Sequence, residues 1–594
     1  MLIRRARFSL PRRPSLLSLF STSPMKRKEA PSSPIIAQHN KKRACSTMAA
    51  TAPRPAISLN AREEQLKGLL LDVAHFIDTN PADGDANKVK PDEPVVLRWA
   101  GGWVRDKLLG IESHDVDTAI NCMTGETFAL RLRDFCAEPE RRERHAIGPQ
   151  DLGTLHKIAR NPDKSKHLET TTTRLFGLDV DFVNLRRETY ADDSRNPQME
   201  FGTAEEDALR RDATVNALFY NLSTGEVEDF TGGIRDMRDK LIRTPLEPLQ
   251  TFTDDPLRVL RLVRFASRLG FTIDPGAEEV MGNANVLEAL RLKISRERVG
   301  VELEKMMKGK YPCWDVVVIA GYVLMSFTGE NPCASLKFID KLGLYHAVFT
   351  DPTRANMPKP DVSNWATAYQ CLDQLARNRT PGSIYDMLVT SEEARYYAWN
   401  LAALTSWAQL PDDPPLRGGK PALPLATQAA REGFKAPNKL SELVTAAHRH
   451  RAQIGRLKDI VHAEQPAKNE RDRFGMAIRE WDSRGGNWRL QVLYAVLVEV
   501  EARTAAGDAD VSAVLAEWQR FLDHLVELDV VDAPSMKRLL DGRVLAEELG
   551  VKPGKWTGPA LDVAMAWQLR NPGVTNYSGA LEEVRKQRKE LGIV

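Results

Sequence analysis

The sequence has few cysteines and no long hydrophobic run, and each absence excludes a class of protein. Six cysteines are scattered through 594 residues without a C-x-x-C pair. Neither a zinc site nor a disulfide framework is therefore indicated, and a reducing compartment fits. No stretch approaches the roughly 18 consecutive apolar residues that would span a bilayer, so we predict no membrane partner. With 42% hydrophobic and 28% charged residues, the composition is that of a globular chain.

A surplus of positive charge is also absent beyond the first fifty residues. The net charge of the whole chain is +2, but residues 1–50 carry +10 and the remaining 544 carry −8. An acidic body argues against a protein that coats nucleic acid through bulk charge. Any nucleic-acid contact would have to use local basic patches.

Residues 1–50 are predicted to form a disordered targeting segment. The stretch from Met1 to residue 28 is rich in Arg, Ser and Leu and has no acid, which is typical of a mitochondrial transit peptide. Two basic clusters follow, at residues 26–28 and 41–43, in sequence too poor in apolar residues to fold. Alternative starts at Met1, Met25 and Met48 would serve the mitochondrial matrix, the cytoplasm and the nucleus. The alternative is a solvated arm without an address.

The first candidate site follows a predicted buried strand over residues 95–100. Gly101 and Gly102 mark a turn, and a helix is predicted to begin near Val104. The bare backbone N–H groups of a helix start, together with the guanidinium of Arg105, would suit a phosphate. A plain turn is the alternative for two adjacent glycines.

Acidic side chains gather on two further predicted strands. In residues 114–120, Asp115 and Asp117 project from one face because strand side chains alternate. Adjacent carboxylates repel unless a divalent cation lies between them, and oxygen ligands suit Mg²⁺. Residues 178–183 would bring Asp181 to the same metals, for in-line attack by a hydroxyl on an α-phosphate. The alternatives are a solvated loop and an edge strand with an acidic outer face.

An arginine-rich helix is predicted from residue 254 onward. Four arginines fall within about 120° of one another on one face: Arg258, Arg261, Arg264 and Arg268. Asp255 lies one turn before Arg258 and faces the same side. An Asp acceptor beside an Arg donor complements cytosine and adenine, whereas uracil and guanine present the reverse order. A solvated basic face is the alternative.

The ordered motifs between Val95 and Met307 carry a family resemblance. They are GGWVRD, HDVD, DALRRDATVNALFYNL, DFTGGIRD, DDPLRVLRLVRFASRLGF and ISRERVGVELEKM. In this order they resemble the class II CCA-adding enzymes, tRNA nucleotidyltransferases of the polymerase-β-like superfamily, and most of all the fungal members. The family usually has Glu where this chain has Asp254.

The resemblance implies site residues, and the following are assigned from it. Asp115 and Asp117 would bind the metals, and Gly102 and Arg105 would lie at the triphosphate, next to Gly101. Arg211 and Asp212 would lie at the nucleotide sugar. Asp255 and Arg258 would form an amino-acid template, with Arg261 and Arg264 also at the nucleotide.

The resemblance also implies the architecture and the activity. The fold class is α+β, with a small nucleotidyltransferase head at residues 60–245 that has a mixed β-sheet and helices. An all-α neck (246–310) and a helical body and tail (311–594) would follow, the latter binding tRNA. The implied reaction adds C, C and A to tRNA from CTP and ATP, with Mg²⁺ as cofactor and a monomer favoured. A poly(A) polymerase, a partial CC- or A-adding enzyme and a catalytically silent RNA-binding protein remain alternatives.

Three connecting or terminal segments are also singled out. Residues 137–173 are predicted to be a mobile loop between strands that helps the switch from CTP to ATP. Residues 229–233 could be a hinge because paired glycines tolerate large backbone changes. A final helix over residues 580–591 carries four basic side chains that could contact tRNA phosphates or could simply be solvated.

Overall fold

The structure is a computed structural model that describes most of the chain after residue 55. The described ranges are 56–80, 93–155, 171–191, 194–308, 313–319, 322–328, 331–354, 356–415, 418–419, 421–508 and 510–593. The chain divides into two units, Met1–Pro53 and Arg54–Val594, and the described residues all lie in the second. The predicted targeting segment lies outside the described residues. Within the described ranges, no helix is both long enough and apolar enough to cross a membrane.

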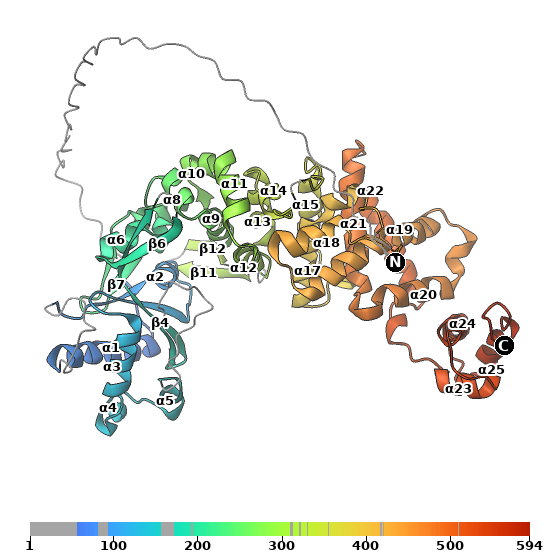
Figure 1. The fold of residues 1–594 in the computed structure, drawn as a ribbon, viewed down its shortest axis with the longest axis horizontal. Helices are drawn as coiled ribbons and strands as arrows, with labels where there is room; N and C mark the ends of the chain where they lie inside the picture. The colour runs from blue at the N-terminus through green and yellow to red at the C-terminus, as the bar shows by residue number, and fades with distance from the viewer. Residues whose placement is uncertain are drawn as a thin grey trace, which may run out of the picture. The chain divides into compact units, whose positions relative to one another are not determined.

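The N-terminal part of the second unit is built on a six-stranded mixed sheet with the strand order β3-β4-β2-β1-β7-β8 (Figure 1). Its strands are β1 (Leu97–Ala100), β2 (Asp115–Ile120), β3 (Thr171–Leu175), β4 (Leu178–Asn184), β7 (Leu218–Asn221) and β8 (Glu226–Asp229). Strands β2 and β4 run parallel, and the other neighbours run antiparallel. A separate antiparallel pair joins β5 (Arg186–Ala191) to β6 (Ser194–Phe201).

Helices complete this region. They are α1 (Ala61–Thr79), α2 (Gly102–Leu108), α3 (Gly125–Phe135), α4 (Pro139–Arg144), α5 (Pro149–Leu155), α6 (Ala204–Leu209) and α7 (Gly233–Arg238), with the 3-10 turn η1 (Thr214–Asn216). An Asn60–Glu63 capping box begins α1. The buried Glu63 then accepts from Trp103 Nε1 at 3.2 Å and pairs with Lys107 Nζ at 2.7 Å, which fixes α2 against α1.

Five helices follow, and one of them, α9, carries the predicted basic face. They are α8 (Pro248–Asp254), α9 (Leu257–Leu269), α10 (Pro275–Met281), α11 (Ala284–Lys293) and α12 (Arg296–Met307). The two-residue strands β9 (Leu241–Ile242) and β10 (Thr272–Ile273) pair in parallel beside α9. The opposite face of α9 is core, because Val259, Val263 and Ala266 are buried.

Arg296 ties α12 to the helices that follow it. Its Nη2 donates to the carbonyl oxygens of Ala347 and Val348 at 3.0 and 2.9 Å, and its Nε donates to that of Gly433 at 2.5 Å. These carbonyls end short helical segments, where the backbone dipole is negative. Burial lowers the pKa of Arg296 to about 10. Even so the guanidinium stays charged at neutral pH and acts as a structural junction.

The rest of the chain is mainly helical. Its helices are α13 (Pro332–Lys341), α14 (Tyr345–Val348), α15 (Trp365–Arg377), α16 (Ile384–Leu388), α17 (Glu392–Ala403), α18 (Leu425–Gln428), α19 (Asn438–His462), α20 (Arg471–Asp482), α21 (Trp488–Ala505), α22 (Val511–Glu527), α23 (Gly542–Leu549), α24 (Thr557–Arg570) and α25 (Ser578–Lys586). Short 3-10 or π segments are η2 (Thr405–Gln409), η3 (Ala429–Gly433), η4 (Pro466–Asn469), η5 (Ser483–Gly485) and η6 (Ala533–Ser535). Helices α23 to α25 enclose a small hydrophobic core of their own, which includes Leu545, Ala560 and Leu581.

The predicted α+β class, a mixed sheet followed by helices, is confirmed. The structure adds a strand pair that the sequence did not predict, β11 (Cys313–Ile319) with β12 (Tyr322–Thr328). The predicted loop at 137–173 contains α4 and α5, and its residues 156–170 lie outside the described ranges. The last helix begins and ends earlier than predicted, at Ser578 and Lys586.

The turn predicted as a hinge is closely held. The carboxylate of Asp229 accepts the backbone N–H groups of four residues, Thr231 to Ile234, at 2.8–3.2 Å. A Cβ at Gly233 would lie 2.3 Å from the carbonyl oxygen of Thr214, so only glycine fits this approach. The turn therefore fastens α7 to η1.

Candidate active site

Two predicted carboxylates share one face of β2. Asp115 is exposed and Asp117 is half-buried, while Val116 between them is fully buried. The parallel pairing of β2 with β4 sets Asp181 directly opposite Asp117. Asp181 Oδ1 accepts a hydrogen bond from Thr172 Oγ1 on β3. The strand alternation predicted from the sequence is confirmed, and it brings four acids to one side of the sheet, because Asp179 pairs opposite Asp115.

The electrostatics of Asp117 fit a site for a cation. Burial raises the pKa of Asp117 to about 6, against the lowering effect of Arg211, and the carboxylates of Asp115 and Asp181 raise it further. Negative charge gathered without a full counter-charge is what a divalent cation would relieve. In the described part of the chain, no set of three or more His, Cys, Asp or Glu side chains is arranged to hold a metal. Asp115 and Asp117 remain the predicted ligands.

Gly101 brings Arg211 beside these carboxylates. Gly101 has φ +68°, and a Cβ there would lie 2.8 Å from Arg211 Nη1 and 3.7 Å from Asp117 Oδ2. Any side chain at Gly101 would displace the guanidinium, so this glycine serves close packing as well as turning the chain. Arg211 and Asp117 are thus neighbours at the start of α2.

A continuous polar network runs from α2 to α12. Arg105 is buried, pairs with Asp106 at 2.6 Å and donates from Nη1 to Asn216 Oδ1 at 2.5 Å. Asn216 in turn donates to Asp212 Oδ1 at 3.4 Å. Asp212 also accepts from Arg261 Nε at 2.5 Å. The predicted phosphate and sugar residues are therefore linked through Asn216, which the sequence analysis did not single out.

The basic face of α9 is largely engaged with acids. Arg264 Nε donates to Glu302 Oε2 at 2.6 Å, and Arg261 Nη1 lies 3.7 Å from Glu302 Oε1. Arg268 lies 3.9 Å from Asp106. Burial would raise the pKa of Asp212, but Arg261 outweighs it and lowers that pKa to about 2. The alternative of a freely solvated stripe is wrong for this face.

The two side chains predicted as template make separate contacts. Asp255 Oδ1 accepts the backbone N–H of Leu257 at 3.1 Å, and its Oδ2 accepts from Arg298 Nη2 at 2.8 Å. Arg258 is buried and donates from Nη2 to the carbonyl oxygen of Arg210 at 2.8 Å. Pro256 is the N-cap residue of helix α9, and Asp255, one residue earlier, accepts the N–H of the first helical residue.

Helix α12 supplies residues that the sequence analysis missed. Arg298 and Glu302 contact the arginine face and Asp255, as described above. Burial lowers the pKa of Lys305, which lies near Glu302, Arg264, Arg261 and Asp115. Arg298, Glu302 and Lys305 are spaced by four and three residues, which predicts that they share one helix face. The spacing does not predict which helix this face packs against.

Comparison with known proteins shows the family of the chain. The family described as the Poly A polymerase head domain matches residues 97–243. The nucleotidyltransferase lcsQ of Purpureocillium lilacinum is 57% identical over 92% of this chain and 94% of its own. The mitochondrial CCA tRNA nucleotidyltransferase of Candida glabrata is 36% identical over 87% of this chain and 94% of its own. The chain belongs to the CCA tRNA nucleotidyltransferase family. The predicted resemblance is therefore confirmed.

The fold agrees as well. A CCA-adding enzyme solved in complex with CTP superposes with a TM-score of 0.56 at 19% identity, covering 90% of this chain and 96% of that one. Conservation of the fold at this identity means that sheet and helices keep their order while most side chains differ.

Proposed function

We propose that this enzyme completes the 3′ end of tRNA by adding C, C and A from CTP and ATP. The carrying observation is that the carboxylates of β2 lie beside a surplus of buried or half-buried cations. Six cations surround the site: Arg105, Arg258, Arg261, Arg264, Arg268 and Lys305. Three acids form ion pairs with them, Asp106, Asp212 and Glu302, in addition to the carboxylates of β2 and β4 that lie beside the site. A nucleoside triphosphate supplies the missing negative charge.

In each transfer the terminal 3′ hydroxyl of tRNA attacks the α-phosphate. A new P–O bond forms as the bond to the β-phosphate oxygen breaks, and pyrophosphate leaves. Asp115 and Asp117 would hold Mg²⁺, which supplies charge stabilisation for the attacking and leaving oxygens. Arg105 and Arg264 would bind the triphosphate, and Arg211 with Asp212 would hold the sugar. Asp181 would complete the acidic face.

Base selection would rest on Asp255 and Arg258. Asp255 offers acceptor oxygens and Arg258 offers donors, which suits the amino group and ring nitrogen shared by cytosine and adenine. A carbonyl of uracil or guanine facing Asp255 would leave buried polar groups unpaired, at a cost of about 1–3 kcal/mol each. Arg298, bound to Asp255 at 2.8 Å, would keep that carboxylate charged and oriented.

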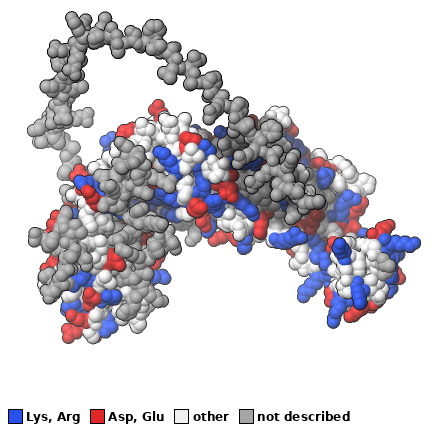
Figure 2. Space-filling model, in the orientation of Figure 1, with Lys and Arg blue, Asp and Glu red and all other residues white. Residues whose placement is uncertain are grey.

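The C-terminal helices would hold the tRNA. The unit of α23 to α25 shows Lys and Arg side chains on its visible surface (Figure 2). From residue 537 onward there are ten Lys or Arg against seven Asp or Glu, whereas the chain after residue 50 is acidic as a whole. The N-terminal segment would direct the enzyme to mitochondria, as the name of the Candida glabrata relative indicates for that protein. Shorter products from Met25 or Met48 would serve the cytoplasm and nucleus.

An incorporation assay tests the activity. Transcripts of one tRNA that end before, within and after the CCA sequence are given labelled CTP or ATP separately. We expect CTP to be used on the first two acceptors, ATP only on the acceptor ending in CC, and neither on the finished tRNA. Continued use of ATP on finished tRNA would indicate a poly(A) polymerase. No incorporation at all would leave an RNA-binding protein.

Asp255→Ala is expected to relax base selection. UTP and GTP should be incorporated at least about tenfold more readily relative to CTP and ATP, because the penalty for a facing carbonyl disappears. Asp115→Ala is the matched control and should abolish transfer of every nucleotide while leaving the protein folded. Unchanged selectivity in Asp255→Ala would refute the template role.

A further inference from the structure

A buried carboxylate behind Arg211 belongs to none of the roles assigned so far. Asp207 lies on α6 and is 1% exposed. Its Oδ2 accepts from Arg211 Nε at 3.0 Å and lies 2.9 Å from Arg211 Nη2. Its Oδ1 accepts from Arg210 Nε at 2.9 Å and from the backbone N–H of Arg186 at 3.3 Å. One carboxylate therefore binds two consecutive arginines, one through each of its oxygen atoms.

We propose that Asp207 is a positioning residue that holds Arg211 at the nucleotide sugar and so sets the preference for ribonucleotides. The inference rests on the proposed function, in which Arg211 contacts the sugar. It adds a residue that touches no substrate and acts only through the guanidinium.

The position of Asp207 is itself fixed by the fold. Helix α6 begins with a capping box of Thr203 and Glu206. Just before it, a Cβ on Gly202 would lie 2.7 Å from the backbone of Arg186 and Arg187, so α6 starts in close contact with β5. A rigid start to α6 gives Asp207 a fixed place from which to hold its arginines.

Arg211 is held on three sides. Asp207 takes its Nε and Nη2, and the carbonyl oxygen of Asn216 accepts from Nη1 at 3.0 Å. The guanidinium lies over the ring of Phe219, with its central carbon 4.9 Å from the ring centroid. These contacts use three of its five N–H donors and fix the plane of the group. The remaining edge has a defined direction beside Gly101.

Charge explains why a carboxylate is needed there. Burial acts to raise the pKa of Asp207, but Arg211 and Arg210 outweigh it and lower the pKa, so the group is ionised at neutral pH. Arg211 lies between two carboxylates, Asp207 behind it and Asp117 in front of it. Without the charge behind, the guanidinium would move toward Asp117 and leave the sugar. A neutral residue of the same shape would not hold it.

The test compares CTP with dCTP as substrates for addition to a tRNA acceptor. For Asp207→Asn we expect the ratio of kcat/KM for CTP over dCTP to fall at least about tenfold. Arg211→Met should give the same fall, and the double variant should fall no further, because both changes remove one interaction. Asp207→Glu keeps the charge and should retain more of the ratio than Asp207→Asn.

Asp236→Asn is the matched control for a merely structural effect. Asp236 is also a buried acid, 3% exposed, and it accepts from Thr214 Oγ1 at 2.7 Å. Its loss should lower the thermal unfolding midpoint without changing the CTP over dCTP ratio. If Asp207→Asn does not fold, the comparison of Asp207→Glu with Arg211→Met decides.

Failure of the proposed function and failure of the role of Asp207 give different results in this test. A wild-type enzyme that adds neither nucleotide overturns the proposed function. A wild-type enzyme that adds both equally, or an unchanged ratio in Asp207→Asn, overturns the role of Asp207 and leaves the addition of C and A intact.

Discussion

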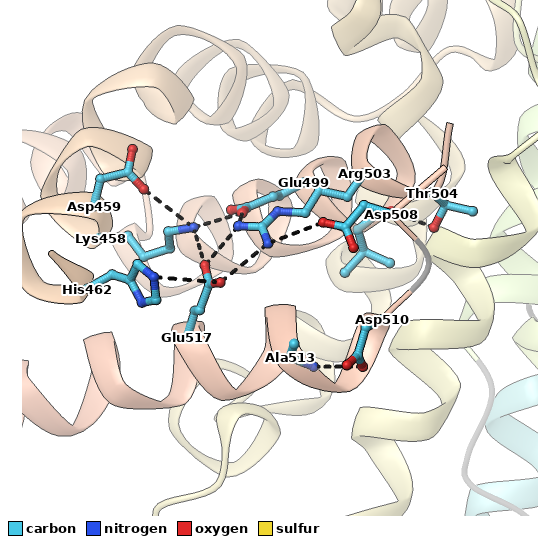
Figure 3. A network of polar contacts seen from close by, with 11 residues as sticks. Lys458, Asp459, His462, Glu499, Arg503, Thr504, Asp508, Asp510, Ala513 and Glu517 are labelled. Carbon is cyan, nitrogen blue, oxygen red and sulfur yellow. Dashed lines mark hydrogen bonds and ion pairs between the residues drawn. The ribbon is translucent and has the colours of Figure 1, made fainter. Parts of the chain in front are cut away.

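Two networks of buried cations in this protein differ in their charge balance. On α9 and α12, Arg261 and Arg264 share Glu302, and Arg261 also holds Asp212. In the helical region, Lys458 of α19 lies 2.7 Å from Glu499 and 3.0 Å from Glu517. Figure 3 shows Lys458 reaching between these two acids, with Arg503 beside both of them. Further cations, Arg105, Arg258 and Arg268, lie around the first network, whereas the two cations of the second pair with two further acids, Asp459 at 3.5 Å and Asp508 at 3.8 Å.

The difference separates a binding surface from a structural joint. A surplus of cations with half-exposed side chains is costly until an anion binds, which suits a triphosphate site. In the cluster around Lys458 every cation already has acidic partners, so no additional anion is needed. Lys458 is 3% exposed and also lies 5.4 Å from the ring centroid of Trp518, so no substrate could reach it. The contrast predicts that one network controls transfer and the other controls stability.

Lys458→Met should produce the largest effect, on stability alone. Glu499 and Glu517 would lose their more buried partner and keep only the 31% exposed Arg503. Removing one member of a buried pair costs about 3–5 kcal/mol of unfolding free energy. Denaturant unfolding followed by tryptophan fluorescence measures it, because Trp518 contacts Lys458. Transfer at a temperature where the variant is folded should match wild type. A loss of transfer in the folded variant would contradict the contrast.

Arg264→Met should produce the reverse pattern. Glu302 keeps Arg261 at 3.7 Å as a partner, so the loss of stability should be smaller than in Lys458→Met, whereas one charge-assisted contact to the nucleotide would be lost. At about 1.5–3 kcal/mol, this corresponds to a fall of roughly 10- to 150-fold in kcat/KM for CTP and ATP. Steady-state kinetics measure it. Arg291→Met on α11, which removes an exposed pair with Glu288, is the control and should leave kinetics unchanged.

The pH dependence of the unfolding free energy of Asp212→Asn tests the ion pair between Asp212 and Arg261 in the first network. The pKa of Asp212 is lowered from 3.8 to about 2, so the ionised form stabilises the folded state by about 2 kcal/mol at pH values well above 4. That contribution is lost as pH falls from about 4 toward 2. The difference in unfolding free energy between wild type and Asp212→Asn should therefore be constant from pH 7 to 5 and shrink below pH 4. A difference that vanishes already at pH 6 would exclude this pairing as its source.

Much of the framework was predictable because it follows local patterns. The strand alternation around Val116 and Val180 follows from the alternation of apolar and polar residues, and the structure confirms it. The arginine face of α9 follows from helical periodicity in the same way. Local patterns also explain the errors. Residues 137–155 are charged and interrupted by prolines, which predicts a loop, but they form α4 and α5.

Contacts between distant segments were not predictable. Glu302 lies 38 residues from Arg264, and Lys458 lies 41 and 59 residues from its two acids. Nothing in the spacing of single acids indicates which helix they will meet. Asp207 is an intermediate case, because its place three and four residues before Arg210 and Arg211 predicts helical pairing. Its burial, which gives the pairing its strength, comes only from the fold.

Arg503→Gln should have the smallest effect on the free energy of unfolding. Compared with Lys458→Met, it separates the effect of burying a charge from the effect of removing one. Its side chain is 31% exposed, and Lys458 still bridges Glu499 and Glu517 when it is gone. Since a half-exposed ion pair contributes about 1 kcal/mol or less, denaturant unfolding should show a shift of that size, and high salt should reduce it. A loss as large as that of Lys458→Met would mean that the count of charges, and not their burial, decides. In that case the surplus of cations on α9 would no longer distinguish a binding site from a joint.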